Sequence, residues 1–259
     1  MIIDNPFVLI IVSSLIAAAS AYVGSFMVLK RMSLVGDALS HVALPGMAIA
    51  IAFGVSPIIG AFVALTVAIV GIWYMEETSE NYPEALVGIF FTASLAIGVL
   101  ITSEAELLEA LFGSIEKMSL IEGITSGILS IFIILIARRY IKPLLISVVS
   151  KELALSTGFN MKKINLLYYF LVGVVVSLGV RFVGTLLMGA LVVVPAASAK
   201  NISQSFKSYY LLSVAIGVVS SLLGIFIAKS LSLEIGPIVV IASIFMYLVT
   251  YVIKLVRGK

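Results

Sequence analysis

Asp37 and His41 are the residues whose types and spacing could do chemistry in this sequence. They stand four positions apart in the segment RMSLVGDALSHVALPG (31–46), and the chain contains 1 histidine in all. On a helix, residues at i and i+4 lie on the same face. A carboxylate beside an imidazole suits Mn²⁺, Fe²⁺ or Zn²⁺ and does not choose among them. Because two ligands hold a divalent ion weakly, the pair is an incomplete metal site, which a two-fold axis between identical subunits would complete.

Pro45 adds a third feature to the segment. A proline inside a helix removes the hydrogen bond to the carbonyl four residues back, which here belongs to His41. The segment would then offer a carboxylate, an imidazole and a released main-chain carbonyl close together. We interpret Pro45 as a helix break beside the site and Pro195 as a second break that shapes a helix end. The alternative is that Asp37 and His41 hydrogen-bond to each other or to a neighbouring helix and only fix packing.

The elements that position this pair are predicted to be membrane-spanning helices. The chain is 62% hydrophobic and 11% charged, with a mean hydropathy of +1.25, whereas soluble domains average about 25% charged residues. Its apolar runs are continuous rather than alternating, so the sequence predicts an all-α polytopic transmembrane bundle. The run at 183–199 is short and holds Pro195, so eight or nine spans are expected. The runs lie near 7–29, 34–54, 57–75, 85–102, 119–137, 164–180, 183–199, 208–228 and 235–255.

The depth of the pair in the bilayer can be estimated from helix geometry. Counted from Ser33, Asp37 lies roughly 6 Å and His41 roughly 12 Å along its helix. Since the hydrocarbon core is about 30 Å thick, His41 approaches the middle. Ionisable groups at such depth cost a few kcal/mol and usually face a cavity or the bundle interior. Asp37 and His41 are therefore candidates for function.

The basic residues predict the orientation of the bundle. With the N-terminus outside, all of the 16 basic residues except Lys117, Arg181 and Lys229 fall on the cytoplasmic side. The inverted arrangement would violate the positive-inside rule. We therefore expect a multi-pass protein of the plasma (cell inner) membrane, with its C-terminus in the cytoplasm.

Several functions are excluded by what the sequence lacks. It has no cysteine, which excludes disulfides, thiolate metal ligands, iron–sulfur clusters and cysteine catalysis. It has no GxxxxGK[ST] motif, so it cannot cradle ATP phosphates itself. Its formal net charge is +3. In a membrane protein, such a small basic excess usually comes from the cytoplasmic loops, so it does not indicate a nucleic-acid partner.

The segment around the pair resembles a known family signature. KRMSLVGDALSHVALPGMAIA (30–50) is similar to the signature of the zinc/manganese/iron permeases of ABC importers, with its basic residue, Ser-Leu, Gly-Asp-Ala, Ser-His and Pro-Gly. Further segments resemble the family in the expected order, so the resemblance spans nearly the whole chain. They are LLEALFGSI (107–115), SKELALSTGFNMKKIN (150–165), VGTLLMGALVVVPAASAK (183–200) and GPIVVIASIFMYLV (236–249).

The resemblance implies a homodimeric permease of the vitamin-B12-importer architecture, with one transmembrane domain over 1–259 and a cytoplasmic coupling segment at about 150–165. It implies a lipid-embedded protein driven by two cytoplasmic ATPase subunits and supplied by an extracytoplasmic metal-binding protein. The metal is cargo, and no cofactor is bound permanently. Asp37 and His41 match the metal contacts of the family's translocation path. Arg181 departs from the family, which tends to be polar and uncharged there, and could pair with Glu122 or Glu234.

The segment 150–158 is the candidate for ATPase coupling. It lies between two spans on the positively charged side, and Gly158 is a helix stop. From the residues alone, an ordinary interfacial helix is the alternative. Its polar start and apolar continuation are Lys151, Glu152, Leu153, Ala154 and Leu155.

The sequence thus favours the permease subunit of an ABC importer that moves zinc, manganese or iron into the cytoplasm, and not an enzyme. A first alternative is a stand-alone proton-coupled secondary transporter in which Asp37 or His41 relays protons. A second is an intramembrane hydrolase, which fits poorly because the chain lacks HExxH spacing and a second acidic residue at membrane depth.

Overall fold

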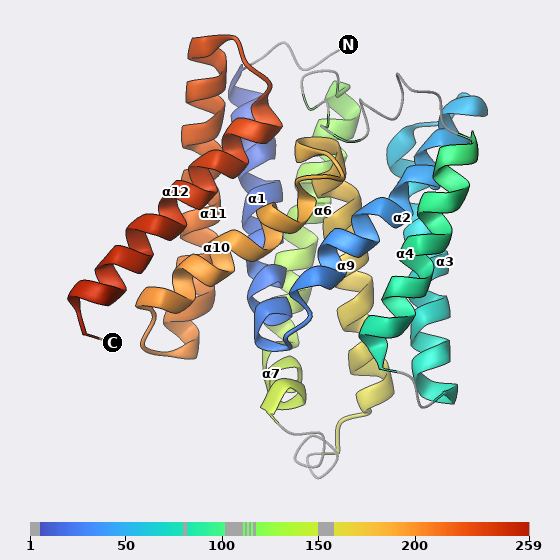
Figure 1. Ribbon diagram of the computed structural model, residues 1–259, viewed down its shortest axis with the longest axis horizontal. Coiled ribbons are helices and arrows are strands. Elements are labelled where there is room, and N and C mark those ends of the chain that lie inside the picture. Colours follow the sequence, from blue (N-terminus) through green and yellow to red (C-terminus); the bar gives the residue numbers. More distant parts are fainter. Residues whose placement is uncertain are drawn as a thin grey trace.

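The computed structural model describes residues 6–79, 82–101, 118–149 and 158–258, together with positions 111, 113 and 115. The helices of this part form one bundle (Figure 1), as the sequence predicts. They are α1 (Pro6–Leu29), α2 (Ser33–Ala52), α3 (Pro57–Thr78), α4 (Pro83–Ile101), α6 (Leu120–Arg139), α7 (Ile141–Val149), α9 (Met161–Val183), α10 (Met188–Ile202), α11 (Phe206–Leu231) and α12 (Ile235–Val256).

Of the helices in the described ranges, 8 are long and apolar enough to cross a membrane. The run expected at 183–199 is different. Helix α9 continues to Val183 and ends at Gly184, whose φ of 87° is in the left-handed region, so α10 begins only at Met188. With 15 residues, α10 is a partial span. The prediction of eight or nine spans is therefore resolved as eight full spans and one short helix.

Neither proline ends its helix. Pro45 lies inside α2 and Pro195 lies inside α10, and both helices continue for several residues beyond. The expectation that Pro195 shapes a helix end is wrong. Both prolines are buried, and packing in a membrane bundle compensates for the one hydrogen bond that a proline removes. The expected break at Pro45 is likewise absent, because α2 runs through it, and the effect of this proline is the one hydrogen bond that it cannot donate to the carbonyl of His41.

Helices α1 and α9 form the centre of the bundle. Helix α1 packs against α11, α10, α6 and α9, and most of its length is buried. Helix α2 crosses the bundle obliquely, with α3 and α4 beside it (Figure 1). The figure also places α7, the beginning of α9 and the C-terminus at one end of the bundle, which we call the α7 end.

The position of α2 is fixed by a backbone contact with α3. A side chain on Gly46 would collide with the carbonyl oxygen of Gly60, and one on Gly60 would collide with the carbonyl oxygen of Gly46. Small residues allow such close approach where no hydrophobic effect drives helices together. The two glycines therefore allow α2, the helix that carries Asp37 and His41, to pack directly against α3.

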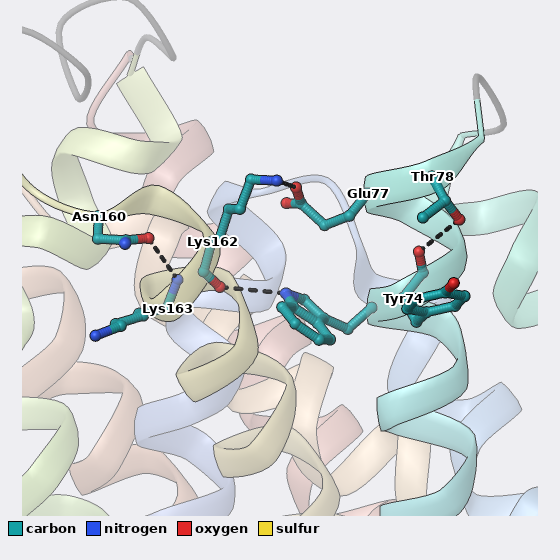
Figure 2. Close-up of polar contacts among 7 residues, drawn as sticks. Tyr74, Glu77, Thr78, Asn160, Lys162 and Lys163 are labelled. Carbon is teal, nitrogen blue, oxygen red and sulfur yellow. Dashed lines mark hydrogen bonds and ion pairs between the residues drawn. The ribbon is translucent and has the colours of Figure 1, made fainter.

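The beginning of α9 is attached to the end of α3 at the α7 end (Figure 2). Lys162 Nζ lies 2.6 Å from Glu77 Oε2, and the indole nitrogen of Trp73 donates to the carbonyl of Lys162 at 3.3 Å. The side chain of Asn160 caps α9 by accepting a hydrogen bond from the amide of Lys163 at 3.2 Å. These contacts fix the first turn of α9, which follows the segment 150–158.

Candidate functional site

Asp37 and His41 are half-buried on α2, between α10 and α4. The His41 ring lies edge-on to the ring of Phe91 from α4, with 5.3 Å between the ring centroids. Its Nδ1 atom is buried, and no atom of the described residues forms a hydrogen bond with it. The Asp37 carboxylate exerts a Coulombic effect on the imidazole. The structure thus brings the two predicted ligands within electrostatic range on one helix.

The Asp37 side chain lies directly against Gly189 of α10. A Cβ atom built on Gly189 would lie 2.9 Å from Asp37 Cβ and 3.0 Å from Asp37 Oδ1. Real Cβ atoms are rarely so close to a neighbour, so the carboxylate occupies the space that a side chain at 189 would need. Glycine at this position leaves room for the carboxylate.

Ser40 connects α2 to the turn that precedes α10. Its hydroxyl lies 2.7 Å from the carbonyl oxygen of Thr185 and 2.6 Å from the carbonyl oxygen of Asp37. The single hydroxyl hydrogen is shared between these two carbonyl acceptors, and the contact with Thr185 joins α2 to the turn. Ser40 is buried, so this contact lies inside the bundle, between α2 and the turn that leads into the helix of Gly189.

Sequence reasoning did not find four residues that surround the pair. Ser40 and Gly189 lie inside segments that carry the family resemblance. These motifs indicated that the two positions matter, but not that they contact the backbone and the carboxylate of the pair. Thr185 contributes only its carbonyl oxygen here, which no side-chain pattern reports. Phe91 lies in an ordinary apolar run, and nothing in the sequence distinguishes it from its neighbours.

The site offers two donors from one chain. Among the described residues, no group of three or more histidine, cysteine, aspartate or glutamate side chains is close enough to hold a metal ion. Asp37 and His41 would together present a carboxylate oxygen and an imidazole nitrogen, which suit first-row divalent ions. Two protein ligands favour transient contact over permanent retention, because structural sites use four.

Arg181 lies near Glu122, at the end of the bundle opposite α7. The Glu122 carboxylate accepts hydrogen bonds from Ser56 Oγ at 2.7 Å and from the amide of Ser119 at 3.0 Å. It also interacts electrostatically with the Arg181 guanidinium. Of the two partners considered for Arg181, Glu122 therefore has an interaction in the structure. The charge that departs from the family pattern is balanced by a carboxylate.

Lys30 connects α9 to the start of α2 at the α7 end. Its Nζ atom lies 3.4 Å from Asn165 Oδ1 and 4.2 Å from the centre of the Tyr168 ring, both on α9. Burial lowers the pKa of Lys30 to about 8, against the opposing effect of the negative charge on Glu76. Lys30 precedes α2 by three positions, so it lies between α9 and the start of the helix that carries the pair.

The predicted coupling residues are described only in part. Gly158 is exposed and has a φ of 75°, two positions before Asn160 caps α9. The remaining coupling residues lie outside the described residues: Lys151, Glu152, Leu153, Ala154 and Leu155.

Comparison with known proteins identifies relatives over nearly the whole length. Residues 5–254 match the ABC 3 transport family. The manganese import system permease protein ScaB of Streptococcus parasanguinis is 32% identical, over 97% of this chain and 90% of the relative. The high-affinity zinc uptake system membrane protein ZnuB of Haemophilus influenzae is 29% identical, over 93% of each chain. The solved structure of PsaBC from Streptococcus pneumoniae in complex with Fab superposes with a TM-score of 0.84 at 29% identity, over 96% of this chain and 92% of that one.

Proposed function

The chain belongs to the ABC 3 transport family, and on that premise we propose that it passes a divalent metal ion between Asp37 and His41 and their copies in a second subunit. It is a membrane-spanning permease subunit of an ATP-binding-cassette importer and not an enzyme. The family match and the relatives thus confirm the predicted permease function and not the two alternatives, the secondary transporter and the hydrolase. A permease of this kind works with an ATPase and with a substrate-binding partner.

The observation that supports the metal path is the pair itself. Asp37 and His41 are ionisable, half-buried and adjacent inside an apolar bundle, which is costly unless the groups have a use. An ion that enters would exchange water for a carboxylate oxygen and a neutral imidazole nitrogen. Two chains related by a two-fold axis would supply four such donors, which is the number that holds Zn²⁺ in structural sites. A homodimer is therefore part of the proposal.

The proposed cargo is Mn²⁺, Zn²⁺ or Fe²⁺. Relatives are named as manganese and zinc permeases, and another is a probable iron transport system membrane protein of Haemophilus influenzae. Carboxylate and imidazole donors bind all three ions. We propose that the ion is cargo throughout, with no cofactor bound permanently.

The proposed topology places the α7 end in the cytoplasm. Most basic residues of the described ranges belong to the connection between α1 and α2, the end of α6, the beginning of α9 and the ends of α10 and α12. These elements end or begin at the α7 end (Figure 1), which agrees with the positive-inside rule. The N-terminus would then be outside and the C-terminus cytoplasmic. One transmembrane domain over 1–259 would contact an ATPase dimer through the segment at about 150–165, and a metal-binding protein on the opposite face.

The proposed coupling route runs from the ATPase to the metal site. The segment 150–158 would receive the motion of the ATPase and pass it to α9, which begins three residues later. Lys30 contacts α9 through Asn165 and Tyr168, and α2 begins at Ser33. A displacement of α9 would therefore move the helix that carries Asp37 and His41.

Reconstitution tests the function as a whole. We expect vesicles that contain the permease, its ATPase and the metal-binding protein to accumulate ⁵⁴Mn²⁺, ⁶⁵Zn²⁺ or ⁵⁵Fe²⁺ only with hydrolysable ATP. Competition among the three ions, offered unlabelled, identifies the cargo. The control is the same vesicle with a non-hydrolysable nucleotide. Concentrative uptake by the permease alone under an imposed proton gradient would contradict ATP-driven import.

Changing the coupling segment is expected to uncouple the transporter. Glu152→Lys combined with Leu155→Asp would reduce cargo-stimulated ATP hydrolysis about tenfold, because a reversed charge and a lost apolar anchor weaken a protein interface by at least that factor. The measurement is phosphate release by the reconstituted complex. The matched control is Arg257→Glu with Leu255→Asp at the exposed end of α12, which should keep full stimulation. Unchanged stimulation in the 152/155 variant would exclude 150–158 as the docking surface.

A further inference from the structure

A cavity of about 680 Å³ lies at the α7 end, where α6 meets α7. This volume falls within the range of roughly 300–1,000 Å³ that is typical of small-molecule sites. None of the residues that line it belongs to the metal site. We call it the basic pocket, and its principal lining residues are Leu135, Arg138, Arg139, Tyr140, Lys142 and Phe159.

Three exposed cationic residues, Arg138, Arg139 and Lys142, are among those that line the basic pocket. Arg138 and Arg139 form the last turn of α6, where cations complement the helix dipole. Lys142 is the second residue of α7, at a helix N-terminus, where the dipole disfavours a cation. Helix capping therefore accounts for the two arginines but not for the lysine. An anion between them would offset the mutual repulsion of the three charges and would also face the N-terminus of α7.

The depth of the basic pocket coincides with the membrane surface. Arg138 follows Leu120, the first residue of α6, by 18 positions, which corresponds to roughly 27 Å along the helix. The hydrocarbon core is about 30 Å thick, so the cations lie at the level of lipid headgroups. Leu135 is 58% exposed and lies one turn nearer the membrane centre. The pocket therefore has a charged side toward water and an apolar side toward the acyl chains.

An exposed apolar stripe on α6 leads to the same pocket. Its members recur every three or four residues and so lie on one helix face. All are at least 46% exposed, so no other described part of this chain covers this face. They are Ile121, Ile124, Ile128, Ile131 and Leu135.

We propose that the basic pocket binds an anionic phospholipid, with its phosphate between Arg138, Arg139 and Lys142 and one acyl chain along the stripe on α6. Basic pockets between helices on the cytoplasmic side of membrane proteins bind such headgroups. A soluble protein partner would match the charges but not the apolar stripe that continues into the membrane. Because Phe159 also lines the pocket, the bound lipid holds the junction of α6 and α7 to the segment that precedes α9.

Native mass spectrometry of the full permease tests this site. The protein is purified from vesicles of phosphatidylcholine that contain either cardiolipin or phosphatidylglycerol, and bound lipids are counted. We expect the wild type to retain an anionic lipid, and the variant Arg138→Gln/Arg139→Gln/Lys142→Gln to bind it at least about tenfold more weakly. The control Lys200→Gln/Lys207→Gln/Arg257→Gln removes three charges from the same side of the membrane and should retain the lipid.

Two further measurements distinguish a bound lipid from a free anion and from a protein partner. The variant Arg138→Lys/Arg139→Lys keeps the charges and should retain most of the lipid, whereas equal loss in this variant would contradict electrostatic binding. Inorganic phosphate should not displace the lipid, because it has no acyl chain to fill the stripe. Equal lipid retention by the glutamine variant and the wild type would overturn the proposal. The proposal would also be overturned if the glutamine variant retained the lipid but lost binding of the ATPase, because the pocket would then be a protein interface.

Discussion

Alanine at Asp37 or at His41 is expected to abolish metal uptake while the transporter stays assembled. Each substitution removes one of two donors per chain, and therefore two of the four that a dimer would present. Loss of a group that only supports a metal ligand already costs about 10–100-fold in affinity, so loss of a ligand should reduce uptake by at least about a hundredfold. The measurement is ATP-dependent uptake of labelled metal into vesicles, with dimer assembly followed by size-exclusion chromatography.

Asparagine substitutions distinguish ligation from packing. Asp37→Asn keeps the size and hydrogen-bonding capacity of the side chain but removes the anionic ligand, and His41→Asn removes the imidazole but keeps a polar group. If the pair binds metal, the asparagine variants should lose uptake as the alanine variants do. If the pair only joins helices, asparagine should preserve uptake, and alanine should chiefly lower the thermal midpoint. Wild-type uptake by both alanine variants would reject the site.

Alanine at Gly189 is expected to displace the Asp37 carboxylate and to reduce uptake by about tenfold or more. The added methyl group would lie 2.9 Å from Asp37 Cβ and 3.0 Å from Oδ1, so the carboxylate must move by several tenths of an ångström or change rotamer. Metal coordination tolerates deviations of only about 0.2 Å in ligand distance. The measurement is the concentration dependence of uptake, which should show weaker metal binding.

The matched control for this change is Gly88→Ala. Gly88 lies within a membrane-spanning helix, and a Cβ built there has no neighbour within 4 Å. Both substitutions exchange glycine for alanine in a helix, where alanine has the higher helix propensity. Gly88→Ala should leave uptake unchanged and keep or raise the thermal midpoint. Equal uptake by the Gly189 and Gly88 variants would show that the carboxylate need not lie where the structure places it.

Much of the fold was predictable because the bilayer restricts the choices. Lipid requires every backbone group to be satisfied internally, so continuous apolar runs indicate helices. The division between α9 and α10 was not predictable in the same way. The run around 183 is apolar on both sides of the turn, and its end at Gly184 depends on a left-handed backbone angle. Pro195 likewise suggested a helix end, whereas its burial among neighbouring helices allows α10 to continue.

The candidate site was predictable in its ligands but not in its surroundings. Asp37 and His41 are conspicuous because ionisable groups are costly in a membrane. Phe91, Thr185 and Gly189 contribute an aromatic face, a main-chain carbonyl and an absence of side chain. None of these properties can be recognised in a sequence, because each matters only through a contact with a residue far away in the chain.

The glycine contact between α2 and α3 restricts how the transporter can open. Where backbones touch at Gly46 and Gly60, there is no interdigitated layer of side chains that could change rotamer to permit sliding. Shear motions depend on small adjustments of packed side chains, so α2 and α3 should travel as one rigid body. The hinge for alternating access would then lie on the other side of α2, where the contact of Ser40 with Thr185 and that of Asp37 with Gly189 are the connections that must be exchanged.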